Sequence, residues 1–371
     1  MDFAFDSIIF DPRDVDLARS PLAGKVDGET FVLGAFNPGL TRLANGNLLM
    51  VVRVAEALRE PVSDSRIRSI RWDGGVYRLD AWPLDAVDRR DPRVIRVRDQ
   101  AGALALTSLS WLLPVELDAA GRRVEAVHYD RAIAPAASYQ SHGIEDARIS
   151  RVGGRYLMTA CSVSAERQCT VLYTSADALS WRLEGIVLDH QNKDMLIFEG
   201  LIDGRYWAET RPLGDAWFAY PPGSDWRAGP AIQLASSPDA LHWKPCDHPG
   251  LRPPATGIPA RLGGGAPPIS TRDGWLTLWH GVEPDDGIGI YRTYWTILDP
   301  ERPWRIVRAG DRPLLQPAPM LTAPLESMAY LGGVVFTTGI VDAGDHYVVA
   351  SGEADLACRI THIPKRAFGL N

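Results

Sequence analysis

The sequence predicts an all-β protein and, more specifically, a five-bladed β-propeller. Short runs rich in Val, Ile, Leu, Tyr, Trp and Thr alternate with Gly, Pro, Asp and Asn along almost all of the 371 residues, and few windows have a helical period. A tight turn that contains Gly and leads into an apolar strand recurs five times. Because a four-stranded blade with its loops takes roughly 40–50 residues, five blades fill the chain. A β-sandwich or two stacked β domains is the alternative, since hairpin signals do not fix how sheets pack.

The five turn-and-strand units follow one another without a linker or a break in composition. They begin at Asn45-Gly46, Gly153-Gly154, Asp203-Gly204, Asp273-Gly274 and Gly344-Asp345. The glycines at positions 204, 274 and 344 lie 70 residues apart, an interval typical of repeated sheets. We therefore expect a single propeller domain over residues 1–371, in which residues 1–30 form an N-terminal arm or extension that precedes the first blade.

Polar residues stand where several of these strands end. The strands lead into Arg53, Glu209 with Arg211, His280, and Glu353 with Asp355. The innermost strands of a propeller line a central channel, so such residues are expected to converge on one opening. Because an unpaired charge beside apolar strands is costly, these residues either pair with one another or face a polar ligand.

Composition excludes several classes of function. The chain has 46 acidic and 39 basic residues, a net charge of −7, which argues against nucleic acid as a partner. No apolar stretch reaches the ~18 residues of a membrane span, and an acidic N-terminus is unlike a signal peptide, so we expect a cytoplasmic protein without a membrane partner. The carboxylates near Asp285 and Asp299 lack the spacing of metal ligands, and no metal site is predicted.

Two carboxylates and an arginine lie together in Glu145-Asp146-Ala147-Arg148, just before a predicted strand. One carboxyl group could donate the proton in a glycosidic cleavage, with the arginine balancing the charge of its neighbour. A structural Asp–Arg pair in a β-turn is the alternative interpretation.

Cations and amides occupy similar places relative to two of the hairpins. Asn37 and Arg53 flank the first, and Lys193 and Arg211 flank the third. Several cations around one channel would bind an oxyanion such as phosphate. Each cation taken singly could instead be solvated or ion-paired on the surface.

Seven segments in order resemble glycoside hydrolase family 130, the β-mannoside phosphorylase family, from about residue 36 to residue 355. They are Phe36-Asn37-Pro38-Gly39 with residues 48–53, Gly143-Ile144-Glu145-Asp146-Ala147-Arg148, residues 192–212, Ser237-Pro238-Asp239 with His242-Trp243, Gly265-Ala266-Pro267-Pro268 with His280-Gly281-Val282, Tyr291 with Leu298-Asp299, and Gly352-Glu353-Ala354-Asp355. The resemblance implies a five-bladed β-propeller that acts on β-mannosides.

The resemblance also implies an inverting, single-displacement mechanism. Asp146 would be the general acid, acting through a hydroxyl of the bound mannosyl unit, while inorganic phosphate attacks the anomeric carbon and releases α-mannose 1-phosphate. Phosphate is a co-substrate, no other cofactor is implied, and no protein base is needed. The implied phosphate ligands are Arg53, Lys193, Arg211, His280 and Tyr291. The implied sugar ligands are Asn37, Glu145, Arg148 and Asp355.

The chain departs from the family pattern near the third hairpin. Many family members read Leu-Phe-Pro-Glu-Lys-Ile where this chain has Ile-Phe-Glu-Gly-Leu-Ile at 197–202, and Ala147 replaces the usual proline. Loss of a cation and gain of a carboxylate suit an inverting β-mannosidase that uses water, with Glu199 or Glu209 as base, roughly 6.5–9.5 Å from the acid. Phosphorolysis is favoured because Arg53, Lys193 and Arg211 are retained, and a propeller that binds glycans without cleaving them is the third alternative.

Two further segments carry predictions. Residues 100–139 are apolar and without clear repeats, and we expect them to supply loops that bind the acceptor sugar. Residues 3–22 precede the matched region and could pack as an arm on a neighbouring copy, which would make the protein a homo-oligomer.

Overall fold

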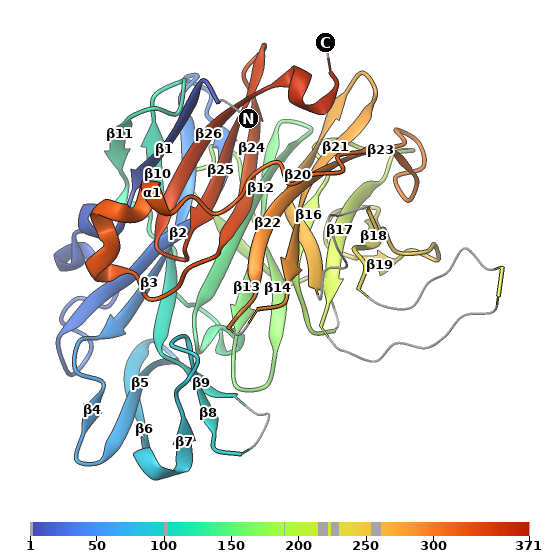
Figure 1. Cartoon of the computed structure of the whole chain (residues 1–371). Coiled ribbons are helices and arrows are strands. Elements are labelled where there is room, and N and C mark those ends of the chain that lie inside the picture. Colours follow the sequence, from blue (N-terminus) through green and yellow to red (C-terminus); the bar gives the residue numbers. More distant parts are fainter. Residues whose placement is uncertain are drawn as a thin grey trace.

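The computed structural model describes residues 3–99, 103–188, 190–213, 222–223, 230–253, 261–285 and 287–370. Strands make up most of it, and the one α-helix among these residues is a single turn, α1 (Pro319–Thr322) (Figure 1). The prediction of an all-β protein is confirmed. No helix in these ranges is long and apolar enough to cross a membrane.

The described residues form five four-stranded antiparallel sheets, numbered here in chain order of their first hairpins. Sheet 1 contains β2 (Thr30–Arg42), β3 (Leu48–Leu58), β10 (Ser108–Leu117) and β11 (Val124–Val127). Sheet 2 contains β12 (Ile144–Val152), β13 (Arg155–Val163), β14 (Gln168–Ser175) and β15 (Arg182–Ile186). Sheet 3 contains β16 (Asn192–Ile197), β17 (Tyr206–Pro212), β18 (Gln233–Ser237) and β19 (Lys244–Pro245). Sheet 4 contains β20 (Arg261–Thr271), β21 (Gly274–Glu283), β22 (Ile290–Leu298) and β23 (Ile306–Ala309), and sheet 5 contains β24 (Val335–Asp342), β25 (His346–Glu353), β26 (Ala357–Pro364) and β1 (Phe5–Phe10).

The five predicted turn-and-strand units are confirmed as the first hairpin of each sheet. The strand after each Gly turn is the second strand, namely β3, β13, β17, β21 or β25. The first strands contact one another between sheets: β2 contacts β12 and β24, β16 contacts β12 and β20, and β20 contacts β24. Other strands also contact neighbouring sheets, for example β13 with β16 and β2 with β25.

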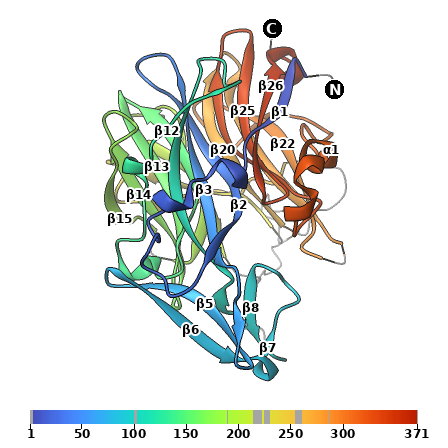
Figure 2. The same ribbon diagram turned by 90° about the vertical axis from the view of Figure 1, so that its left-hand side faces the viewer.

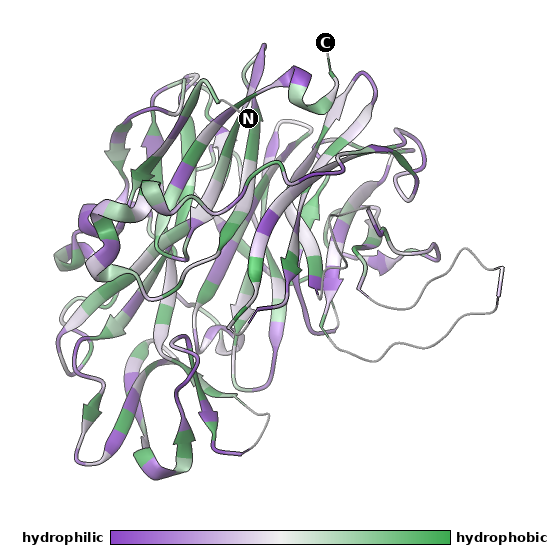
Figure 3. Ribbon diagram, viewed as in Figure 1, coloured by the Kyte–Doolittle hydropathy of each residue, from purple (hydrophilic) through white to green (hydrophobic). Residues whose placement is uncertain are grey.

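Apolar residues fill the spaces between neighbouring sheets. Five clusters of buried side chains each combine residues of two sheets, in the pairs 1–2, 2–3, 3–4, 4–5 and 5–1. Apolar and polar positions mix along the strands, as expected where a sheet has buried and solvent-facing positions (Figure 3). Each sheet is thus held by apolar burial against two others.

A bulge interrupts the first strand of every sheet at a similar place. The pairing register with the second strand shifts between Phe36 and Gly39, Glu145 and Arg148, Lys193 and Leu196, Gly264 and Ala266, and Thr337 and Gly339. The first strands approach closely there, since a Cβ atom on Gly39 would lie 2.9 Å from the carbonyl oxygen of Ala147. A bulge bends a strand and re-aims one side chain, which becomes important for the site.

An insertion between β3 and β10 was not predicted. Residues 59–107, which we call the lobe, contain two three-stranded sheets below sheet 1 (Figures 1 and 2). Their strands are β4 (Val62–Ser63), β5 (Arg66–Asp73), β6 (Val76–Pro83), β7 (Val87–Asp88), β8 (Val94–Val97) and β9 (Ala103–Leu106). The lobe has a small core of its own, around Ile67, Val87, Ile95 and Ala105. Ala57 before the lobe pairs with Ser108 after it, so the pairing of β3 with β10 in sheet 1 is not interrupted by the insertion.

The N-terminal residues differ from the predicted arm. Strand β1 pairs with β26 and completes sheet 5, so residues 5–10 pack on their own chain. The cause is ionic as well as apolar: the guanidinium of Arg359 donates two 2.7 Å hydrogen bonds to Asp6 and one of 2.9 Å to Glu353. Further along, the hydroxyl of Ser20 donates to the buried carboxylate of Glu56 at 2.5 Å.

Replacing Arg359 by leucine is expected to lower the free energy of unfolding by about 3–5 kcal/mol, because it leaves the buried carboxylate of Glu353 without a cation. Urea denaturation measures the loss. Arg123→Leu is the control, since the pair of Arg123 with Glu125 is exposed and its loss should leave the stability almost unchanged. Equal losses in the two variants would contradict the stabilising role given to Arg359.

Candidate active site

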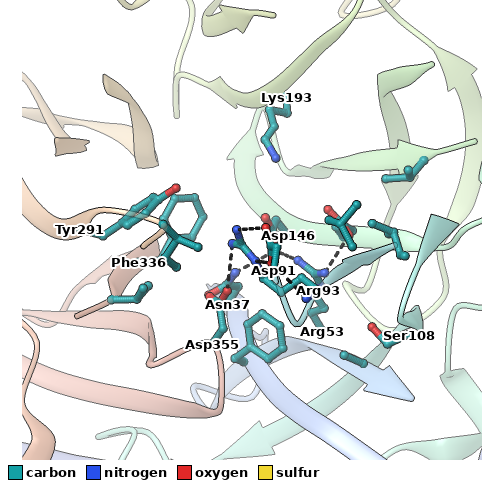
Figure 4. A pocket seen from close by; sticks show the side chains of 18 of the residues that line it. Asn37, Arg53, Asp91, Arg93, Ser108, Asp146, Lys193, Tyr291, Phe336 and Asp355 are labelled. Atoms are coloured by element: carbon teal, nitrogen blue, oxygen red, sulfur yellow. Dashed lines mark hydrogen bonds and ion pairs between the residues drawn. The ribbon is translucent and has the colours of Figure 1, made fainter. Parts of the chain in front are cut away.

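One cavity of about 310 Å³ gathers most of the predicted site residues. Those that line it are Asn37, Arg53, Glu145, Asp146, Lys193, Arg211, Tyr291 and Asp355 (Figure 4). Four predicted residues do not line it, namely Arg148, His280, Glu199 and Glu209. The cavity is therefore lined by residues of all five sheets.

Asp146 occupies the bulge of β12. Its backbone is in the left-handed region, with φ of 55°, and Asn37 in the bulge of β2 has φ of 49°. Asp and Asn accept this conformation more readily than most residues. The amide of Asn37 donates a 2.9 Å hydrogen bond to Oδ1 of Asp146, so the two bulges fix each other's side chains.

Arg53 binds both carboxylates of the predicted acidic pair. Its Nη1 donates to Asp146 at 3.0 Å, its Nη2 donates to Glu145 at 2.7 Å, and its Nε donates to the Ser110 hydroxyl at 3.0 Å. Burial opposes ionisation of Asp146. The positive charges of Arg53, Arg148 and Lys193 outweigh burial and lower the pKa of this carboxyl to about 2. The carboxyl is therefore ionised at neutral pH.

Asp194 occupies the equivalent bulge of β16 and was missed by the sequence analysis. Its φ is 53°, and its carboxylate lies 3.1 Å from Nη1 of Arg211 and 3.4 Å from Nη2 of Arg148. A signal was available, because Asn37, Asp146 and Asp194 precede the glycine of their turns by nine, seven and ten residues.

Lys193 and Arg211 bring positive charge to the cavity from sheet 3. The half-buried ammonium of Lys193 forms no hydrogen bond or ion pair with any described residue. Arg211 also lines the cavity and is held from behind by Asp194. An ammonium without a partner beside an oriented guanidinium is suited to bind an anion.

His280 lies behind Arg211 and is almost completely buried. Its Nδ1 donates to the carbonyl oxygen of Gly264 at 3.1 Å, and its Nε2 accepts from Nη1 of Arg211 at 3.2 Å. Burial lowers the pKa of His280 to about 3, so the ring is neutral and can accept this bond. His280 therefore contacts Arg211 and does not line the cavity.

Arg148 lies beneath Asp146 rather than in the cavity. Its Nη1 donates to the backbone carbonyl of Asp146 at 2.6 Å, and its Nε donates to the carbonyl of Gly265 at 2.8 Å. These bonds join the bulges of β12 and β20. The predicted direct contact with sugar is not supported, because only 2% of Arg148 is exposed.

Asp355 faces the lobe across the cavity. The Nη1 of Arg93 lies 3.8 Å from its carboxylate, and the hydroxyl of Tyr330 donates to its backbone carbonyl at 2.8 Å. Burial raises the pKa of Asp355 although Arg93 and Arg53 oppose the shift. Arg93 and Tyr330 were not predicted, since no motif around them indicated a site.

Glu199 and Glu209 do not reach the cavity. Glu209 precedes Arg211 by two residues on the same face of β17, and is therefore one step deeper, where both carboxyl oxygens are buried without a hydrogen-bond partner among the described residues. Glu199 accepts a 3.0 Å bond from the backbone amide of Arg151. Burial raises the pKa of Glu209 to about 8 and that of Glu199 to about 7.

The predicted acceptor loops lie mainly in sheet 1. Of the described residues between 100 and 139, only Leu106 and Ser108 line the cavity, because β10 and β11 carry much of the rest away from it. Within the described ranges, no group of three or more His, Cys, Asp or Glu residues could hold a metal ion.

The chain is similar to one family along most of its length. The sequence profile Glyco_hydro_130, described as beta-1,4-mannooligosaccharide phosphorylase, matches residues 120–368. A beta-1,2-mannobiose phosphorylase of Listeria innocua is 31% identical over 357 residues, which cover 91% of this chain and 90% of that protein. A 1,2-beta-oligomannan phosphorylase of Thermoanaerobacter sp. is 32% identical over 218 residues, which cover 57% of this chain and 65% of that protein. The solved beta-1,2-mannobiose complex of beta-1,2-mannobiose phosphorylase from Listeria innocua has a TM-score of 0.79 at 28% identity, covering 98% of this chain and 97% of that one.

Glu209→Gln is expected to flatten the dependence of stability on pH. The pKa of this carboxyl is about 8 in the folded protein and ~4.3 in the unfolded chain. Between these values the free energy of unfolding therefore falls by about 1.4 kcal/mol for each unit of pH increase. Urea denaturation at pH 5, 6, 7 and 8 should therefore show a falling free energy of unfolding for the wild type and a smaller fall for the variant. Glu326→Gln, at an exposed position, is the control and should follow the wild type. Parallel curves for all three proteins would refute the assignment.

Proposed function

The chain belongs to glycoside hydrolase family 130, and we propose that it is an inverting β-mannoside phosphorylase that releases α-mannose 1-phosphate. The observation that carries the proposal is the unpartnered ammonium of Lys193, which lines the same cavity as Arg211 and Asp146. These cations can hold the nucleophile, and Asp146 can supply the proton. The substrates are a β-mannoside oligosaccharide and inorganic phosphate, with no other cofactor.

In this mechanism, phosphate binds to Lys193, Arg211 and Tyr291. His280 keeps the guanidinium of Arg211 oriented. A phosphate oxygen attacks the anomeric carbon on the face opposite the leaving oxygen, so the bond to the leaving sugar breaks as the bond to phosphate forms. Asp146 supplies the proton of the leaving oxygen through a hydroxyl of the mannosyl unit. Arg53 is held by two carboxylates, which favours a role in orienting Asp146 over direct binding of phosphate.

Phosphate also changes the charge around Asp146. The cations that keep this carboxyl ionised include Lys193, which the bound dianion would offset. Binding of phosphate would therefore raise the pKa of Asp146 and favour the protonated form that an acid requires. Binding of phosphate and protonation of Asp146 would then occur together.

The hydrolytic alternative lacks support from the two glutamates suggested for it. Glu199 and Glu209 do not line the cavity, so neither is placed to activate a water there. A glycan-binding role without turnover remains the second alternative, and the assay below separates all three. We propose β-1,2-mannobiose as the first substrate to test, because relatives of 31% and 32% identity carry β-1,2-mannoside names.

We also propose that the five sheets are the blades of one β-propeller and that residues 1–371 form a single domain. Support comes from the contacts between first strands and from the five apolar clusters, which pair the sheets in the order 1–2–3–4–5–1. The pairing of β1 with β26 joins the two ends of the chain in one blade.

The reaction is tested by incubating the protein with β-1,2-mannobiose, with and without phosphate, and following the products by NMR. We expect α-mannose 1-phosphate only when phosphate is present. Asp146→Asn should lower turnover by at least about 100-fold, because the proton donor is lost. Release of α-mannose at equal rates without phosphate would identify a hydrolase, and binding without any turnover would leave a glycan-binding protein.

Lys193→Met is expected to raise the KM for phosphate by about tenfold or more, since a charge-assisted contact is removed. Calorimetric titration with inorganic phosphate should show a matching loss of affinity. Lys244→Met is the control on the same sheet, at an exposed position, and should leave both values unchanged. An unchanged KM in Lys193→Met would remove Lys193 from the phosphate site.

A further inference from the structure

We propose that the lobe binds the leaving sugar, and that Arg93 determines which sugar is accepted there. The inference rests on the proposed function and extends it to the acceptor. Three observations carry it: the lobe residues that line the cavity, the side of Asp146 on which they lie, and the gap between Arg93 and Asp355.

The lobe lines part of the cavity although it belongs to none of the five sheets. Its lining residues are Asp91, Arg93, Val94, Arg96 and Leu106. The strand that follows, β10, adds Ser108. A polar and partly apolar surface of this kind is suited to a sugar, whose ring presents hydroxyls at its rim and C–H groups on its faces.

The lobe and the phosphate cations lie on opposite sides of Asp146 in the order of sheets. Asp146 is on β12, which contacts β2 on one side and β16 on the other. Lys193 and Arg211 belong to sheet 3, beside β16, whereas the lobe is attached to sheet 1, beside β2. Figure 4 likewise shows Lys193 apart from the group of Arg53, Arg93 and Asp355. Because an inverting attack is in line, the leaving sugar must lie away from the phosphate, and the lobe is on that side.

Arg93 and Asp355 are spaced so that one hydroxyl group in the cavity can bridge them. Nη1 of Arg93 and Oδ2 of Asp355 are 3.8 Å apart, too far for a hydrogen bond. A sugar hydroxyl beside the pair, about 2.8 Å from each atom, could accept from the guanidinium and donate to the carboxylate. Arg93 is already fixed for this role, because its Nε and Nη2 each donate to Asp91 at 3.0 Å. A preoriented donor loses little entropy on binding, so it can discriminate between sugars that differ in one hydroxyl.

The lobe contains a matched control for Arg93. Arg90 binds Asp88 in the same way, two residues apart and with the same backbone bond, but its side chain is 91% exposed. Arg93 is 33% exposed and lines the cavity. The two arginines therefore share a local motif and differ in what they face.

The test uses the synthetic direction, with α-mannose 1-phosphate as donor and mannose or glucose as acceptor, and phosphate release as readout. For Arg93→Ala we expect the KM for mannose to rise about tenfold or more, and the preference for mannose over glucose to shrink. The KM for the donor should stay within about twofold, which also shows that the variant is folded. Arg93→Lys should recover part of the loss, and Arg90→Ala should match the wild type.

An unchanged KM for mannose in Arg93→Ala would overturn the inference, as would a rise in the KM for the donor alone. If the wild type proves inactive in both directions, the proposed phosphorylase fails. The role of Arg93 is then decided by calorimetric binding of β-1,2-mannobiose. Affinity lower in Arg93→Ala than in Arg90→Ala supports it, and equal affinity overturns it.

Discussion

The site depends on one constraint, that a strand buried among others must remain paired and yet turn a side chain out of its sheet. The bulge solves this in each first strand at the cost of one disturbed pair of hydrogen bonds. Where the bulge residue is Asn37, Asp146 or Asp194, a short polar side chain tolerates the left-handed backbone and reaches the cavity or its floor. Arg148 donates hydrogen bonds to backbone carbonyls in the bulges of β12 and β20, so a displacement of one bulge would shift the other.

Charge balance follows from this arrangement. The bulges bring carboxylates into a buried region, and each requires cations, which Arg53 and Arg148 provide. Arg53 and Arg148 form ion pairs within the chain, whereas the ammonium of Lys193 forms no hydrogen bond or ion pair with any described residue. An ammonium without a carboxylate partner favours an anion over a neutral ligand, because the anion adds Coulombic attraction to the hydrogen bond.

Local signals predicted the five hairpins, because Gly turns and apolar strands need only neighbouring residues to be recognised. The same signals could not tell which residue of a strand reaches the cavity: Arg211 lines it, whereas Glu209, two residues earlier, does not. Four of the six lobe strands have only two to four residues. The eight-residue strands β5 and β6, joined at Gly74-Gly75, carry the same hairpin signal, but it does not indicate where they pack. Arg90 and Arg93 each follow an aspartate by two residues, so the sequence alone does not distinguish them. They differ in exposure, which depends on tertiary structure.

The pairing of β1 with β26 also bears on how the chain is made. Phe5 pairs with His362, so β1 can reach its partner only after more than 350 further residues have been synthesised. At about 5–20 residues per second this delay is tens of seconds, during which β1 has no partner and sheet 5 is not yet formed. An unpaired strand can pair with another chain. The nascent protein is therefore open to misassembly at β1 until β26 has been synthesised and can pair with it.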